Sequence, residues 1–246
     1  MMIALGIDIG GSGIKAAPVD PATGELLADR HKLLTPTRPT PKAVARTVAQ
    51  VAAHFKWTGP VGITFPGWIV DGEIGSAANM GGKIWVGKHG PSVFRAASTQ
   101  PVTVLNDADA AGIAEMKFGA GVGEMGPVYV LTFGTGIGTA FFHDGVLVPN
   151  CEEGHLQLRG MEAEHYTSGK VREDEKLTMK QWAARVSEYL QLLEDLHHPS
   201  LFIIGGGISR RSEEFLHLLK TKRARVVRAA MCNNAGIVGA AMAAVA

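Results

Sequence analysis

Two glycine-rich segments, each between two short apolar runs, contain residue types that bind phosphate groups. The first is Gly10-Gly11-Ser12-Gly13, with Asp8 just before it, and the second is Gly134-Thr135-Gly136. Glycine lets several main-chain N–H groups converge on one anion, and the hydroxyls of Ser12 and Thr135 could donate further hydrogen bonds. A carboxylate such as Asp8 could hold Mg²⁺ through water. Both segments are therefore predicted to bind phosphate, and a pair of ordinary tight hairpins is the alternative.

Three consecutive glycines, Gly205, Gly206 and Gly207, follow the apolar run 201–204 and precede a predicted helix around 212–220. A flat ligand or a phosphate could lie against bare backbone at the N-terminus of such a helix. The alternative is a turn without a ligand.

Neither hairpin tip has the Walker A or the G-x-G-x-x-G spacing, which disfavours a P-loop enzyme and a Rossmann oxidoreductase.

The polar sequence Asn106-Asp107-Ala108-Asp109 follows the apolar run 102–105, at a strand end where open α/β sheets bind ligands. An aspartate within reach of a substrate hydroxyl can accept its proton while the hydroxyl attacks phosphorus. We assign this base to Asp107, and a capping or orienting role to Asp109. The alternative is that either aspartate only caps the helix predicted over 110–118.

A short stretch after Cys151 brings acids and an imidazole together. Glu152, His155 and Glu164 could recognise a polyol, because each sugar hydroxyl both donates and accepts a hydrogen bond, and Glu162 belongs to the same stretch. The alternative is a solvated turn. A zinc site is less favoured, since Cys151 is the only cysteine nearby and the next histidine lies too far along the chain for paired ligands.

The composition narrows the class of protein that carries these residues. The 246 residues include 31 glycines and two cysteines, and the net charge is +1. Such a chain can bury a substantial core, and its balanced charge gives no reason to expect nucleic acid or an anionic membrane as a partner. The two cysteines fit a reducing compartment, here the cytoplasm. No apolar run approaches the ~20 residues of a membrane span, and we expect no signal peptide.

Apolar periodicity and turn residues predict the elements that position these groups. Runs at 3–9 and 14–19, and at 127–133 and 137–143, predict two hairpins whose turns are the glycine-rich tips. Further strands are predicted at 26–34, 61–65, 102–105 and 201–204. Thr40-Pro41 predicts a helix start, and Thr178 with Gln181 a capping box for a helix whose apolar face runs from Trp182 to Leu196. Residues 235–246 predict a small-residue helix that packs closely. The similar hairpins favour a duplicated α/β unit, with tips facing across a cleft.

In their order, these segments resemble the ROK sugar kinases, a group within the actin-like, hexokinase-like ATPase superfamily. The resemblance extends from residue 3 to the end and rests on residues 8–15, 64–67, 106–107, 131–138, the sequence Glu152-x-Gly-His155, and residues 205–208. More narrowly, the segments 76–79, 106–112, 147–150 and 234–241 resemble the polyphosphate glucokinases of that family.

The resemblance implies an α/β, two-lobed actin-like (ribonuclease H-like) ATPase fold with a central cleft. Residues 1–105 plus 232–246 would form the N-terminal small lobe, and residues 106–231 the C-terminal large lobe. It implies a kinase that transfers a phosphoryl group from inorganic polyphosphate, ATP or both to the 6-hydroxyl of glucose, and a homodimer. Closure of the lobes would exclude water as a competing acceptor.

The resemblance also implies roles for individual residues. Asp107 would be the general base. The sugar would be held by Asn79, Asn106, Glu152, His155 and Glu164, although Asn79 could equally be a turn residue. The phosphoryl donor and Mg²⁺ would be held by Asp8, Gly10, Gly11, Ser12, Gly13, Lys15, Thr132, Gly134, Thr135 and Gly136. Gly205, Gly206 and Gly207 would hold adenine and ribose if the donor is ATP. Many ROK kinases carry a cysteine-rich zinc motif after the Gly-His pair, but residues 156–163 contain no cysteine, so no structural zinc is expected.

The preference for polyphosphate rests on the resemblance. A run of cations, Lys220, Lys222, Arg223, Arg225 and Arg228, could guide a polyanion, and the alternative is a solvated helix end. A strictly ATP-dependent ROK hexose kinase is the second candidate function. A non-catalytic sugar-binding regulator and an actin-like filament protein are less favoured, because they leave Asp107 or the acid–histidine cluster without a purpose.

Overall fold

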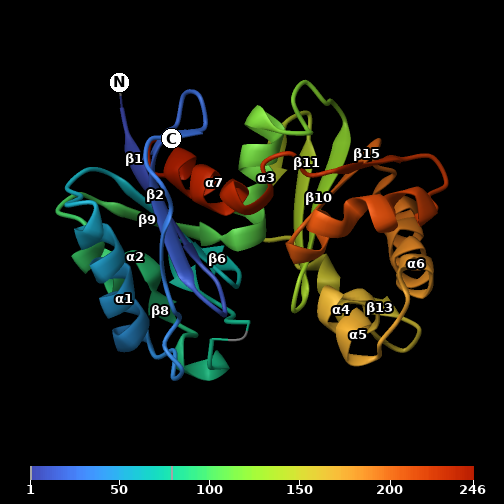
Figure 1. Cartoon of the computed structure of the whole chain (residues 1–246), viewed down its shortest axis with the longest axis horizontal. Coiled ribbons are helices and arrows are strands. Elements are labelled where there is room, and N and C mark those ends of the chain that lie inside the picture. Colours follow the sequence, from blue (N-terminus) through green and yellow to red (C-terminus); the bar gives the residue numbers. More distant parts are fainter. Residues whose placement is uncertain (1, 79) are drawn as a thin grey trace. The chain divides into compact units, whose positions relative to one another are not determined.

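The computed structural model describes residues 2–78 and 80–246, and the chain divides into two compact units (Figure 1). The first unit comprises Met1–Ala114 and Asn234–Ala246, and the second comprises Glu115–Asn233. The sequence-based boundary at residue 105 differs from this division, which keeps residues 106–114 in the first unit. The physical reason is close helix packing: a Cβ at Gly239 would lie 1.8 Å from the main-chain oxygen of Ala110.

The first unit contains a mixed sheet with strand order β3-β2-β1-β5-β9, and β4 pairs with β2. β1 and β2 form an antiparallel hairpin, whereas β5 runs parallel to β1 and β9 runs parallel to β5. The strands of this sheet are β1 (Ala4–Ile9), β2 (Ile14–Asp20), β3 (Glu25–Leu26), β4 (His31–Leu33), β5 (Val61–Phe65) and β9 (Val102–Asn106). The other elements are α1 (Pro41–His54), β6 (Ile69–Val70), β7 (Glu73–Ile74), β8 (Lys88–His89), α2 (Gly90–Phe94), α3 (Asp107–Phe118) and α7 (Ala235–Ala243).

The helices α1 and α7 pack on opposite faces of this sheet (Figure 1). The predicted start of α1 is confirmed: the Thr40 hydroxyl accepts a hydrogen bond from the Ala43 N–H, and the apolar side of the helix is buried against the odd-numbered residues of β1. The predicted close packing of the small-residue helix is also confirmed. A Cβ at Gly6 or Gly62 would lie within 1.9 Å of a main-chain oxygen of α7.

The second unit contains a five-stranded sheet with the order β12-β11-β10-β15-β16. As in the first unit, an antiparallel hairpin is followed by two parallel strands, which is the duplicated topology that the similar hairpins predict. Its strands are β10 (Pro127–Phe133), β11 (Ile137–His143), β12 (Val146–Val148), β15 (Leu201–Gly205) and β16 (Arg225–Arg228). The other elements are β13 (Gln157–Leu158), β14 (Met161–Glu162), α4 (Ala163–Thr167), α5 (Gly169–Asp174) and α6 (Met179–His197).

The long helix α6 covers one face of this second sheet. The predicted capping box at its start is present, since the side chains of Thr178 and Gln181 each bond the other residue's backbone. Its predicted apolar face is buried from Trp182 to Leu193, but Leu196 is 50% exposed. Packing therefore ends one helical turn before the predicted stripe does.

Two predicted elements are wrong in detail. The segment predicted as a helix around 212–220 forms two short 3₁₀ segments, Gly207–Glu214 and Leu216–Leu218. Arg211 has non-helical backbone angles, and Phe215 turns inward to pack edge-on against the Trp182 ring, with centroids 5.0 Å apart. The predicted strand at 26–34 is divided into β3 and β4, which pair with different parts of β2.

Within residues 2–78 and 80–246, no helix has the length and apolar character needed to cross a membrane.

Candidate active site

The tip between β1 and β2 has the geometry of a tight glycine turn. The Gly10 N–H donates to the Gly13 carbonyl oxygen at 3.0 Å, and Gly11 and Ser12 are exposed at the apex. The tip is held from outside, because the Thr35 hydroxyl donates to the Gly10 carbonyl oxygen at 2.6 Å. The structure therefore presents the predicted phosphate-binding tip to solvent on a fixed hairpin.

Asp8 lies beside this tip, with both carboxylate oxygens engaged. The Thr64 hydroxyl donates to Oδ1 at 3.0 Å, and the Lys15 ammonium lies 3.3 Å from Oδ2. Thr64 also accepts a hydrogen bond from the Ile9 N–H at 3.2 Å, so β5 fixes the Asp8 side chain on β1. The role of Thr64 was not predicted from the sequence, because nothing local shows that residues 56 positions apart are neighbours in a parallel pair.

Asn106 and Asp107 lie where β9 meets α3, at the predicted strand end. Asn106 is buried, and its Oδ1 accepts hydrogen bonds from the N–H groups of Ala108 at 2.8 Å and Asp109 at 3.0 Å. Asn106 thus supplies the helix cap, which was one of the two roles predicted for Asp109. Asp107 is half-buried, and its Oδ1 accepts from the Ala108 N–H at 2.9 Å. The helix does not depend on the Asp107 carboxylate for its cap.

A chain of contacts joins this turn to the segment that precedes Asn79. The Asn106 Nδ2 donates to the Gly67 carbonyl oxygen at 3.2 Å. A Cβ at Gly67 would lie 2.1 Å from the Ser76 carbonyl oxygen, and the Ala78 N–H donates to the Pro66 carbonyl oxygen at 2.8 Å. Asn79 itself lies outside the described residues.

In the second unit, the β10–β11 tip and the triple glycine lie side by side. The Gly134 N–H donates to the Gly136 carbonyl oxygen at 3.0 Å, and Thr132 pairs with Gly205 across parallel strands. Gly206 has φ +80°, and a Cβ there would lie 2.5 Å from the Phe133 carbonyl oxygen, so only glycine fits. Gly207 faces open space. The prediction that the glycines begin an α-helix is wrong, since the 3₁₀ segment Gly207–Glu214 follows them.

The acid–histidine cluster lies against this same tip. A Cβ at Gly154 would lie 2.7 Å from the Ile137 carbonyl oxygen, which presses the Glu153–His155 turn onto β11. Glu164 reaches the tip directly: its Oε2 accepts from the Ile137 N–H at 3.3 Å. The structure therefore brings the predicted sugar-binding acid Glu164 next to the predicted donor-binding glycine Gly136.

Glu162 orients His155. Its Oε2 lies 2.9 Å from His155 Nδ1, while Glu152 Oε2 lies 3.6 Å from His155 Nε2. The hydrogen bond to Glu162 raises the pKa of His155, and the same bond lowers the pKa of Glu162. Burial raises the pKa of Glu152, partly offset by the nearby imidazole of His155. The role of Glu162 was not predicted from the sequence, which only places it in the cluster.

Ligand-type atoms of His155, Glu162 and Glu164 lie within 4.8 Å of one another. Such a set could hold a cation or sugar hydroxyls. The Nδ1 atom of His155 is already bonded to Glu162, which makes the cluster a hydrogen-bonded one that presents acceptors and one imidazole donor.

A second carboxyl in this turn points into the core. Glu153 Oε1 accepts the Tyr129 hydroxyl at 2.7 Å, and His197 Nδ1 lies 3.4 Å from the same oxygen. Burial raises the pKa of Glu153. Glu153 therefore ties the turn that carries Glu152 and His155 to β10 and to the last turn of α6.

The cation run near residues 220–228 is partly neutralised. Lys222 pairs with Asp195, and the Arg225 guanidinium lies 2.6 Å from Glu124. That this run guides a polyanion stays a prediction. The run carries less uncompensated positive charge than the sequence alone implied.

Comparison with known proteins defines the class. The crystal structure of an inorganic polyphosphate/ATP-glucomannokinase from Arthrobacter sp. strain KM superposes with a TM-score of 0.93 at 44% identity, covering 98% of both chains. A ROK family glucokinase from Streptomyces griseus in complex with glucose and AMPPNP superposes with a TM-score of 0.80 at 25% identity, covering 97% of this chain and 98% of that one. The fold is the two-lobed, actin-like ATPase fold of sugar kinases.

The ROK family model matches residues 4–170. A polyphosphate glucokinase of Mycobacterium tuberculosis is 50% identical over 242 residues, which are 98% of this chain and 91% of that protein. This chain belongs to the ROK family.

Proposed function

We propose that this protein is an enzyme that transfers a phosphoryl group from inorganic polyphosphate to the 6-hydroxyl of glucose, giving glucose 6-phosphate. One observation carries the chemistry: a half-buried carboxylate, Asp107, follows a strand end while its neighbour Asn106 caps the helix. Relatives at 44% to 50% identity over nearly the whole chain, named as polyphosphate-dependent glucokinase and glucomannokinase, support the choice of donor and acceptor.

Asp107 acts as the general base. As the glucose 6-oxygen attacks the terminal phosphorus, its proton passes to the Asp107 carboxylate. A bond forms between that oxygen and phosphorus, and the bond from the same phosphorus to the rest of the donor breaks. The donor leaves one phosphate shorter and keeps the electron pair of the broken bond.

Sugar recognition is assigned to side chains that accept hydrogen bonds and to side chains that donate them. Glu152 and Glu164 accept hydrogen bonds from sugar hydroxyls, and His155, held by Glu162, donates one. Asn106, whose Nδ2 donates to the Gly67 carbonyl oxygen, belongs to this set by resemblance to the family. Asn79 belongs to this set by resemblance to the family.

The donor is assigned to the glycine tips, residues 10–13 with Lys15 and residues 132–136. Asp8 fits a role in holding Mg²⁺ through water, since a fixed carboxylate beside the tip is the ligand type that this ion prefers. Mg²⁺ would offset the negative charge of the donor phosphates. When ATP is the donor, Gly205, Gly206 and Gly207 provide bare backbone beside the second tip for adenine and ribose.

Two further expectations belong to this proposal. The protein works in the cytoplasm, which agrees with two cysteines, Cys151 and Cys232, that form no disulfide. It forms a homodimer, as the resemblance to the family implies, and sedimentation velocity would measure this.

The test is glucose 6-phosphate formation with Mg²⁺ and two separate donors, nucleotide-free long-chain polyphosphate and ATP. Turnover with polyphosphate supports the proposal. Turnover with ATP alone would replace it by a strictly ATP-dependent hexose kinase and would leave the role of Asp107 intact. Glucose binding without transfer from either donor would instead indicate a sugar-binding regulator.

A further inference from the structure

Two lysines face each other beside the first glycine tip. In the antiparallel pairing of β2 with β4, Lys15 lies directly opposite Lys32. Side chains of such a pair share one face of the sheet, with Cβ atoms roughly 5 Å apart, and like charges there destabilise the sheet. Lys15 is compensated by Asp8 at 3.3 Å. Within residues 2–78 and 80–246, Lys32 forms no ion pair or side-chain hydrogen bond, so its exposed ammonium lacks a counter-ion from the protein.

The Lys32 side chain packs against the tip. A Cβ at Gly13 would lie 2.4 Å from the Lys32 Cε and 3.4 Å from its Cδ, so the aliphatic stem lies on this glycine. Three residues further on, Thr35 bonds Gly10 at the other end of the tip. The segment that contains Lys32 is therefore fixed against the predicted phosphate-binding turn at two points.

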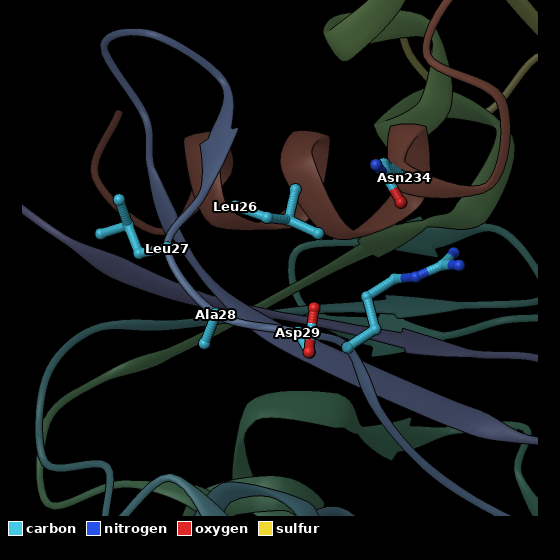
Figure 2. A pocket seen from close by; sticks show the side chains of 6 residues that line it. Leu26, Leu27, Ala28, Asp29 and Asn234 are labelled. Carbon is cyan, nitrogen blue, oxygen red and sulfur yellow. The ribbon is translucent and has the colours of Figure 1, made fainter.

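A polar pocket lies beside the segment that leads into β4. It has a volume of about 400 Å³ and is lined by Leu26, Leu27, Ala28, Asp29, Arg30 and Asn234, from the β3–β4 connection and the start of α7 (Figure 2). Arg30 lies two residues before Lys32, at most ~7 Å along the chain.

The far wall of this pocket also leads back to the tip. Asn234 immediately precedes α7, and two residues later a Cβ at Gly236 would lie 3.3 Å from the Asp8 carboxyl carbon. Asn234 on the pocket wall is therefore two residues from the α7 position that lies against Asp8. Asp29 is the one acid and Arg30 the one cation in its lining.

We propose that Lys15, Lys32 and Arg30 form a cationic track that binds phosphates of the polyphosphate chain beyond the one transferred. This inference rests on the proposed function. The path from Lys15 across to Lys32 and then along the chain to Arg30 is at most roughly 12 Å long, so a long chain contacts all of it and a short donor only its beginning. An ATP donor has a nucleoside where the chain would continue. The track therefore favours long polyphosphate over short chains and ATP.

The test compares Lys32→Gln and Arg30→Gln with Lys42→Gln, which removes an equally exposed charge from α1 on the opposite face of the sheet. Loss of one charge-assisted contact should raise the KM for long-chain polyphosphate about tenfold. The KM values for glucose, ATP and tripolyphosphate should change little. The KM for long chains should also become less sensitive to salt. The melting temperature checks the fold, which should tolerate removal of the positive charge of Lys32 because Lys32 lies opposite the like-charged Lys15.

The outcomes separate the two claims. Absence of polyphosphate turnover in the wild type would remove the proposed function. With an active wild type, equal polyphosphate KM values for Lys32→Gln, Arg30→Gln and Lys42→Gln would remove the track and leave the function standing. An equal rise in the KM for ATP or tripolyphosphate would also remove it, because the cations would then bind the transferred phosphate rather than the chain beyond it.

Discussion

Replacing Asp107 by asparagine separates the proposed base from the structure around it. Asparagine has the same shape, and its side-chain oxygen can accept the Ala108 N–H that Asp107 Oδ1 accepts at 2.9 Å. The helix cap comes from Asn106, through bonds of 2.8 and 3.0 Å, and is untouched. We therefore expect the free energy of unfolding to change by less than about 0.5 kcal/mol.

The chemical step should respond strongly to the same replacement. An amide cannot take the proton of the glucose 6-hydroxyl, and a positioned general base contributes about 10²- to 10⁴-fold. This corresponds to roughly 3–5 kcal/mol in the barrier. Because Asp107→Asn keeps the size and one hydrogen bond of the side chain, the loss should appear in kcat, with a smaller change in the KM for glucose.

The assay follows glucose 6-phosphate with a coupled dehydrogenase at saturating donor, together with urea unfolding of the same preparation. Asn106→Ala is the contrasting variant: it removes the acceptor of two main-chain N–H groups and should cost about 1–2 kcal/mol of stability. A kcat for Asp107→Asn within tenfold of the wild type would refute the assignment of the base. Unfolding of Asp107→Asn in the urea experiment would instead refute the expected stability, because its low kcat would then reflect loss of the fold.

Two other predictions concern the second unit. Glu162→Gln removes the carboxylate charge that raises the pKa of His155. In the wild type this pair stabilises the fold below the unfolded pKa of histidine, and the contribution is lost as pH rises through the folded value. The difference in melting temperature between the wild type and Glu162→Gln should therefore be larger at about pH 6 than at about pH 9. A difference that does not change with pH would contradict the pairing of Glu162 with His155. Gly206→Ala should cost about 3 kcal/mol or more in urea unfolding, because φ is +80° and the new Cβ would meet the Phe133 backbone at 2.5 Å. Gly207→Ala, which faces open space, should be nearly neutral, and similar losses for both would show that the clash is not the cause.

Local signals in the sequence were sufficient for several elements. Thr40 before Pro41, and Thr178 with Gln181, predict helix starts that the structure contains, since a cap involves residues only three positions apart. The two hairpins were predictable for the same reason, because each strand pairs with its neighbour across a short glycine turn. Where long-range packing decided, the prediction was wrong: the inward turn of Phe215 replaced a predicted helix by 3₁₀ segments.

The candidate site divides in the same way. The types and order of its residues, from Asp8 to the triple glycine, follow from the sequence and point to phosphoryl transfer to a polyol. Their partners do not: Thr64 on Asp8, Glu162 on His155 and Asn106 as the cap of the Asp107 helix each follow from one contact seen only in three dimensions.

The sequence by itself thus determined which chemical groups are present and which turns carry them, because turn and cap preferences act over a few residues. The tertiary structure alone decided which side chains meet. Strand register placed Lys32 opposite Lys15 and Thr64 beside Asp8, and such pairings depend on how segments far apart in the chain align when the core is buried.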